Sequence, residues 1–196
     1  MKETRTFLGI IAILAMIGFG LTACETDPCA DCFAIGATGE GGGIIIYHDH
    51  AGFTVTGLGT CYYLEAAPTN QTTSVTWSSS ANTIYVNVTG ATGTAIGTGK
   101  ANTAAIIAAH SSDTASNNAA KAAVAYPGGG KSDWFLPSRE ELSEMCKARD
   151  HLGISGSFWS SSQHSTNAAF SEYCGYGTHG TDNKETLRNV RAIRAF

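Results

Sequence analysis

The stretch Trp134-Phe135-Leu136-Pro137-Ser138 constrains the fold of this chain more than any other segment. Three large apolar residues in succession have to be buried, and the proline disfavours helix in the residue before it. Ser138 and Glu141 follow in the Ser-x-x-Glu pattern of a capping box, so a helix is predicted to begin here and to end at Gly153. The apolar face of this helix is expected to comprise Leu142, Met145, Cys146 and Leu152. The stretch therefore has an architectural role and not a catalytic one.

Short strands and small-residue helices are predicted for the rest of the chain. Apolar and β-branched runs bounded by glycine, proline or polar residues predict strands at 44–47, 61–68, 74–77, 83–88, 168–173 and 186–196. Alanine-rich segments at 101–109 and 117–125 predict helices that pack closely against a sheet. The serines at 160–162 are interpreted as the exposed alternation of a strand and a turn, and 175–185 as a polar, glycine-rich loop. A strand at 186–196 builds the C-terminus into a sheet, so truncation there is expected to be costly.

Glycines at 39–43 precede the first predicted strand. A phosphate-binding loop needs the strand first and a helix after it, so this reversed order excludes dinucleotide binding. His48 and His50 end the strand with one residue between them, so both point to the same face of extended backbone. That is the spacing of a metal pair. Without a third ligand, a solvated strand end is the favoured interpretation and no metal is predicted.

The N-terminal segment has the features of a bacterial lipoprotein signal peptide over residues 1–23. Lys2 and Arg5 precede an apolar run from 7 to 21, which is shorter than the ~20 residues that a membrane-spanning helix needs. Leu21-Thr22-Ala23-Cys24 is similar to a lipobox, which predicts cleavage after Ala23 and lipidation of Cys24. An ordinary secretory signal with a chance cysteine is the alternative.

Lipidation would attach the mature chain to a membrane effectively permanently, because several acyl chains hold one residue. Glu25 follows the cysteine where an aspartate would resemble an inner-membrane retention signal, so the outer membrane of a Gram-negative cell is the expected location. The chain has 12 basic and 16 acidic residues, and removal of 1–23 takes away two basic residues and one acidic residue, which leaves a formal charge of −5. Nucleic acid is not expected as a partner, because its binders usually show a basic face. Residues 24–35 are interpreted as a tether and 36–196 as one domain.

Five cysteines remain after lipidation, and an odd number cannot all pair. Because disulfides are the default in an exported protein, up to two bridges and one free thiol are expected. Cys29 and Cys32 have the spacing of a redox or zinc half-site. They lie in the tether without a preceding strand or a second such pair, so structural or incidental roles are favoured.

Several motifs occur together in an order that resembles a known family. They are Gly41–Tyr47, Gly97–Thr103, Ser132–Ser138, and Phe158–Ser162 with Val190–Phe196. This combination resembles the C-terminal domain of the Legionella collagen-like adhesin, over residues 36–196. The resemblance implies binding at the cell surface, since the adhesin that names the family attaches to sulfated host polysaccharides. This chain differs because it has no collagen-like repeats and is acidic, which weakens any expectation of a trimer or a sulfated ligand.

The stretch at 134–138 and the closing strand also resemble parts of the C-type-lectin-like fold. That resemblance implies an α+β protein with a twisted antiparallel sheet and packed helices. A bridge between helix and sheet would suit such a fold, and we expect Cys146 to pair with Cys174. Fold alone does not give function.

The predicted function is that of a lipid-anchored, adhesin-like module that binds carbohydrate or another surface ligand. Aromatic faces stack on sugars while amides and carboxylates bond hydroxyls, and one stretch interleaves both types; the residues expected to bind are Tyr173, Tyr176, His179, Asp182, Asn183 and Lys184. A structural envelope component without a small ligand is the alternative. No cofactor is predicted. No enzyme is predicted either, since neither a Gly-x-Ser-x-Gly elbow nor a zinc-protease helix motif occurs.

Overall fold

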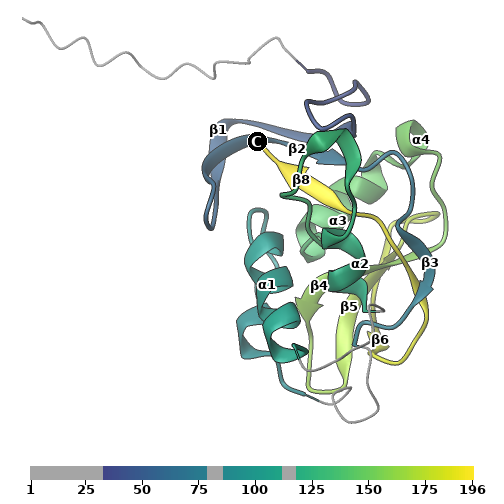
Figure 1. Ribbon diagram of the computed structural model, residues 1–196. Helices are drawn as coiled ribbons and strands as arrows, with labels where there is room; N and C mark the ends of the chain where they lie inside the picture. The colour runs from purple at the N-terminus through teal and green to yellow at the C-terminus, as the bar shows by residue number, and fades with distance from the viewer. Residues whose placement is uncertain (1–32, 79–85, 112–117) are drawn as a thin grey trace, which may run out of the picture.

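The computed structural model describes residues 33–78, 86–111 and 118–196 and shows an α+β protein. The predicted signal peptide, Cys24, Cys29 and Cys32 lie outside the described residues. Within them, three strands come first along the chain, followed by the helices and then by five more strands, and the strands form two separate sheets (Figure 1). The predicted mixture of helices and strands is therefore confirmed.

The first sheet has three antiparallel strands in the order β1-β2-β8: β1 (Ile44–Val55), β2 (Gly59–Ala66) and β8 (Ile193–Ala195). The second has five strands in the order β3-β7-β4-β5-β6: β3 (Thr72–Val75), β7 (Arg188–Val190), β4 (Ser157–Gln163), β5 (Ala168–Tyr173) and β6 (Thr178–Asn183). Its β4–β7 pairing is parallel and its other pairings are antiparallel. The expectation of one twisted antiparallel sheet was thus wrong in detail.

The helices pack beside and between the two sheets (Figure 1). They are α1 (Gly99–Ala109), α2 (Ala119–Val124), α3 (Arg139–Lys147) and α4 (Arg149–Leu152), with short 3-10 turns η1 (Thr89–Ala91) and η2 (Gly128–Gly130). The first two confirm the predicted alanine-rich helices within the described residues. The third contacts β1 of the first sheet and β4 and β5 of the second. Helix α3 therefore packs against both sheets.

The stretch before α3 connects two hydrophobic cores. Side chains alternate across extended backbone, so Trp134 and Leu136 enter one core while Phe135 enters the other. Backbone bonds of 2.9 Å in both directions pair Phe135 with Ile193 of β8. The Trp134 indole N–H is satisfied by the carbonyl of Gly128 at 3.1 Å. The architectural role predicted for this stretch is confirmed.

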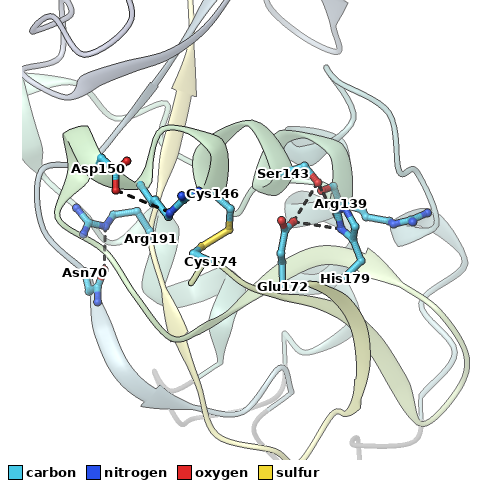
Figure 2. Close-up of a disulfide and its surroundings, with 10 residues drawn as sticks. Asn70, Arg139, Ser143, Cys146, Asp150, Glu172, Cys174, His179 and Arg191 are labelled. Carbon is cyan, nitrogen blue, oxygen red and sulfur yellow. Dashed lines mark hydrogen bonds and ion pairs between the residues drawn. A yellow bond between two sulfur atoms is a disulfide. The ribbon is translucent and has the colours of Figure 1, made fainter. Parts of the chain in front are cut away.

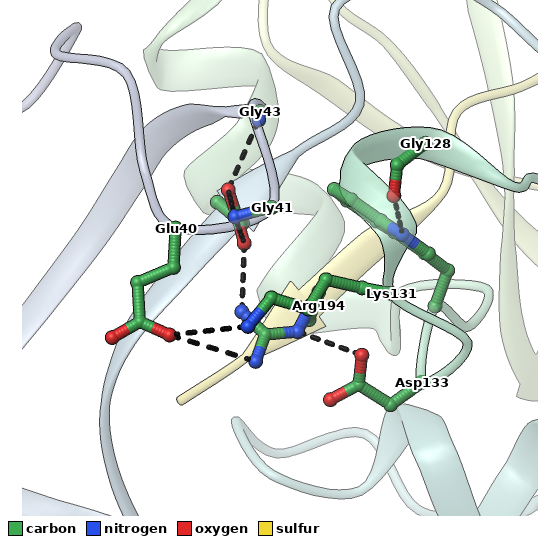
Figure 3. Close-up of polar contacts among 9 residues, drawn as sticks. Glu40, Gly41, Gly43, Gly128, Lys131, Asp133 and Arg194 are labelled. Atoms are coloured by element: carbon green, nitrogen blue, oxygen red, sulfur yellow. Dashed lines mark hydrogen bonds and ion pairs between the residues drawn. The ribbon is translucent and has the colours of Figure 1, made fainter.

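A buried carboxylate organises the first sheet (Figure 3). Glu65 of β2 is fully buried and accepts the N–H groups of Gly41 at 2.8 Å and Gly43 at 3.0 Å. It also pairs with Arg194 of β8 at 2.9 Å, and the same guanidinium reaches Asp133 at 2.7 Å. The turn at 39–43 therefore binds a side chain of its own protein.

The capping box at the start of α3 is present as predicted, and Leu142, Met145 and Cys146 are buried on α3 as expected. The single helix predicted up to Gly153 is divided at Ala148, so Leu152 is buried on α4 instead. The Glu141 carboxylate is fully buried and accepts the N–H groups of Ser138 at 2.7 Å and Gly97 at 2.8 Å. Burial raises its pKa from 4.5 to about 7, against the lowering effect of these hydrogen bonds. Gly153 ends α4 in the left-handed region with a φ of 60°, which favours glycine.

Four predicted segments differ from the structure. The segment 86–88 is not a strand, and 83–85 lie outside the described residues. Ser160, Ser161 and Ser162 are buried, because β4 lies between β7 and β5 and is covered by α1 and α3. The predicted loop at 175–185 contains β6, paired with β5 over its whole length. The segment 186–196 forms two strands in different sheets, although it does place the C-terminus in a sheet as predicted.

The raised pKa of Glu141 predicts a pH-dependent stability. The folded protein binds this proton more tightly than the unfolded chain, so the stabilisation is full below pH 4.5 and is lost as the pH rises through about 7. The free energy of unfolding of the wild type should therefore fall by about 3 kcal/mol between pH 5 and 8. Glu141→Gln has no carboxyl group at this position and should not show this fall. Urea unfolding across this range measures it. Glu140→Gln, on the exposed side of α3, is the matched control and should keep the wild-type slope.

A disulfide joins α3 to the end of β5, as predicted. Cys146 and Cys174 are bonded at 2.02 Å and are both buried (Figure 2). Cys61 is the free cysteine of the described residues. The bridge closes a segment with a sequence separation of 28. It therefore limits the unfolded chain as well as fastening the helix to the sheet.

Removal of this bridge should lower the free energy of unfolding, because the unfolded chain gains conformational freedom once Cys146 and Cys174 are no longer linked. The double variant Cys146→Ala and Cys174→Ala is expected to lose about 3 kcal/mol in the free energy of unfolding, measured with urea. Cys61→Ala keeps the bridge and serves as a control for the loss of a buried sulfur. A double variant no less stable than Cys61→Ala would show that the bridge contributes nothing.

Candidate functional site

An open groove runs along the solvent side of α3, and we call it the α3 groove. It consists of two adjoining cavities of about 370 and 400 Å³ that share Tyr47, Glu144 and Lys147. The first cavity is also lined by Ile35, Ile46, His48, Ala148 and His151, and the second by Ile96, Arg139, Glu140, Ser143 and His179. Helix α3 therefore forms one wall, while β1 and β6 contribute side chains from other parts of the chain.

The polar wall follows from the helical pattern of α3. Leu142, Met145 and Cys146 are buried on one face, so residues three and four positions apart on the other face reach solvent. Glu144 and Lys147 are paired there at 2.6 Å. Two hydrogen-bonding charges of opposite sign thus lie side by side at the centre of the groove.

Tyr47 of β1 supplies an aromatic ring to both cavities. Its ring packs edge-on against Phe53 with 5.8 Å between ring centroids, and its hydroxyl is 3.5 Å from an Asp49 carboxylate oxygen. Burial raises the pKa of Tyr47, and the nearby charges of Asp49 and Glu144 raise it further. The phenol therefore stays neutral and can donate or accept a hydrogen bond.

His179 and Ser143 line the second cavity, and the buried Glu172 contacts both of them (Figure 2). Its Nδ1 is 3.2 Å from Glu172 Oε2 and 3.5 Å from Ser143 Oγ. In a catalytic triad the serine and the acid bind opposite nitrogens of the ring. Here both contact the same nitrogen, so these residues hold one another in place and do not form a proton relay.

The predicted binding residues are divided between two faces of the β5–β6 hairpin. His179 pairs with Glu172 and faces α3, whereas Tyr173, the next residue on β5, points to the opposite face. Tyr176 stacks on Tyr173 with 5.4 Å between centroids and is 86% exposed. Asp182 is held on that face by Arg188 at 2.9 Å and by the Ser171 hydroxyl. Its pKa is lowered by these partners despite its burial.

The six residues therefore do not form one surface. Asn183 is exposed on β6, and His179 is the member of the set that lines the α3 groove. Lys184 was wrongly placed at a surface. It is fully buried, its ammonium lies 4.5 Å from the Trp77 ring centroid, and it donates to the Val86 carbonyl at 2.9 Å and to Gln163 Oε1 at 2.7 Å.

His48 and His50 lie within β1 and not at its end. Their rings share one side of the strand with 4.1 Å between centroids, and His48 also stacks on Tyr63. Across residues 33–78, 86–111 and 118–196, no three of the His, Cys, Asp and Glu side chains are grouped so as to hold a metal ion. The spacing did predict the shared face.

The α3 groove itself was missed from the sequence, although its helix was predicted. The available signal was the polar face of α3, with Ser143, Glu144 and Lys147 at helical spacing. The contributions of Tyr47 and His179 come from distant strands, and no local pattern indicates that they meet there. Together these residues offer an aromatic face with hydrogen-bond donors and acceptors around it, which suits a polar, hydroxyl-rich ligand.

Comparisons with models of protein families and with curated protein sequences find no match. In the part of the chain that the structure describes, no helix is both long and apolar enough to cross a membrane.

Because it is buried, Lys184 should affect stability at alkaline pH. Burial lowers its pKa from 10.5 to about 8, so the folded state binds fewer protons than the unfolded chain between these values. The free energy of unfolding should gain from this residue as the pH rises from about 8. Lys184→Met lacks this gain, so its free energy of unfolding relative to wild type should fall as the pH rises from about 7.5 to 9.5, measured by urea unfolding. Lys147→Met, at an exposed lysine, is the control, and an equal loss there would contradict the prediction.

Proposed function

We propose that this protein is a lipoprotein, anchored through Cys24 in the bacterial outer membrane, whose domain binds a carbohydrate in the α3 groove in the manner of an adhesin. The observation that carries this proposal is the Tyr47 ring, which lies in both cavities among the polar side chains of α3. Sugar rings stack on aromatic faces while their hydroxyls need donors and acceptors close by. The groove offers both within volumes ordinary for ligand sites, roughly 300 to 1,000 Å³.

Charge pairing within the groove favours a neutral sugar. The lining sets Arg139 and Lys147 against Glu140 and Glu144, and Lys147 is paired with Glu144 at 2.6 Å. These charges therefore largely offset one another before a ligand arrives. A sulfated polysaccharide, such as the family's namesake adhesin binds, would need an excess of cations, so a neutral or weakly charged ligand fits this chain better.

Membership of the adhesin domain family, and a C-type-lectin-like fold, remain part of the proposal. Residues of the motifs that carry the resemblance make contacts between separate parts of the fold, which supports the family proposal. Residues 134–138 connect the two cores, and Arg194 in the last motif pairs with the buried Glu65. The α+β architecture also agrees with it at the level of fold class.

A second candidate is a structural envelope protein that binds another protein. The observation in its favour is the far face of the β5–β6 hairpin, where Tyr176 is 86% exposed and stacks on Tyr173, which is 39% exposed. Large apolar side chains in solvent often mark protein contacts. This surface is separate from the α3 groove, so variants can distinguish the two candidates.

Glycan binding by the full chain in detergent tests the proposal. The chain is applied to a panel of neutral and sulfated glycans at low and physiological salt, and binding to neutral members that persists at physiological salt is expected. Tyr47→Ala should weaken it at least about tenfold, which corresponds to ~1.4 kcal/mol. Tyr47→Phe keeps the ring and should retain most of the affinity.

Tyr176→Ala is the matched control, because it removes an exposed tyrosine outside the groove and should leave affinity unchanged. Loss of binding in Tyr176→Ala but not in Tyr47→Ala would move the site to the hairpin. No binding to any glycan would favour the structural role.

A further inference from the structure

A buried carboxylate behind the α3 groove determines which hydrogen-bonding groups the groove presents. Glu172 of β5 is only 4% exposed. Its Oε2 atom lies 3.0 Å from Ser143 Oγ on α3 and 3.2 Å from His179 Nδ1 on β6 (Figure 2). One oxygen atom of Glu172 thus contacts side chains from two neighbouring elements.

The positions of the protons follow from this geometry. An ionised carboxylate only accepts hydrogen bonds, so each of its two neighbours has to donate. Ser143 then directs its single hydroxyl proton to Glu172, and His179 carries a proton on Nδ1. In a neutral imidazole the other nitrogen, Nε2, is left with a lone pair and no proton.

The free nitrogen is the one that does not contact Glu172, in a ring that lines the groove. Nδ1 is the atom in contact with Glu172, whereas the His179 side chain is 44% exposed and lines the second cavity of the groove. Nε2 is the ring nitrogen on the far side from that contact. The groove consequently presents an acceptor at this position, while Arg139 and Lys147 present donors elsewhere in it.

We propose that Glu172 is a positioning residue that fixes His179 in the Nδ1-protonated tautomer, so that Nε2 accepts a hydrogen bond from a free hydroxyl group of a bound sugar. The ligand in this statement rests on the proposed function, whereas the tautomer is a property of the protein alone. A free hydroxyl can donate to Nε2, but an O-methyl group or a carboxylate cannot. The groove therefore selects for a free hydroxyl group at this position and against an O-methylated or anionic one.

Nitrogen NMR of the full chain in detergent, labelled with ¹⁵N in histidine, tests the tautomer without any ligand. At about pH 8, where histidine is ordinarily neutral, His179 should show its proton on Nδ1 and an unprotonated Nε2. Glu172→Leu should convert it to the mixture of tautomers of a solvated imidazole. Glu172→Gln keeps an acceptor oxygen and should restore the wild-type pattern. His164, exposed on the turn after β4, is the internal reference and should not change.

Sugar titration of the same samples tests the acceptor. Methyl β-galactoside, methyl β-glucoside and methyl α-mannoside are added separately, each beside its fully O-methylated counterpart. At least one free sugar should shift the His179 Nε2 resonance, and the methylated forms should not. Glu172→Leu should lower the affinity for that sugar by about tenfold, the equivalent of one neutral hydrogen bond.

The outcomes separate this inference from the proposed function. A wild-type His179 with its proton on Nε2, or a tautomer that is unchanged in Glu172→Leu, overturns the positioning role of Glu172. An O-methylated sugar that binds as well as its free form overturns the acceptor role. The expected tautomer without a response to any sugar overturns carbohydrate binding in the groove and leaves the positioning role established.

Discussion

The buried ion pair between Glu65 and Arg194 is the interaction on which the arrangement of the molecule depends. A buried carboxylate without a partner is very costly, so the groups around it have to be brought together during folding. The partners of Glu65 come from the turn at 39–43 and from β8, and Arg194 extends the contact to Asp133, beside the stretch that joins the two cores. The pair also explains three of the four glycines of that turn, because a Cβ at 39, 41 or 43 would meet the Glu65 carboxylate. A Cβ on Gly41 would lie 2.6 Å from the Glu65 carboxylate and 2.9 Å from the Trp134 ring.

Features set by neighbouring residues could be predicted from the sequence. The capping box of Ser138 and Glu141 is a local pattern, and the spacing of Leu142, Met145 and Cys146 follows from the same helix. Most strands with an apolar or β-branched run, such as β2 and β5, were found for the same reason. The Cys146–Cys174 bridge was expected only through the resemblance to a fold, since cysteine spacing alone leaves several pairings open.

Features set by distant residues could not be predicted. β6 has the sequence Thr-His-Gly-Thr-Asp-Asn, and it is extended because it pairs with β5 at the edge of a sheet, not because of any apolar alternation. Lys184 has the composition of a surface residue, yet Trp77 and Gln163 enclose it from parts of the chain far away in sequence. The prediction of one binding surface across 173–184 was wrong because it assumed a loop, whereas a strand sends successive side chains to opposite faces. The α3 groove was missed because Tyr47 and His179 reach it from different sheets.

The short strands β7 and β8 have a consequence for the order of folding. These two strands lie within residues 188–195, and each belongs to a different sheet. β7 places Val190 in a hydrophobic core, and β8 places Arg194 against Glu65. Until these residues have left the ribosome, both sheets lack a strand and Glu65 lacks its cation. Stable tertiary structure should therefore form only after synthesis has passed residue 195, which leaves the nascent chain without a complete sheet until its last residues are made.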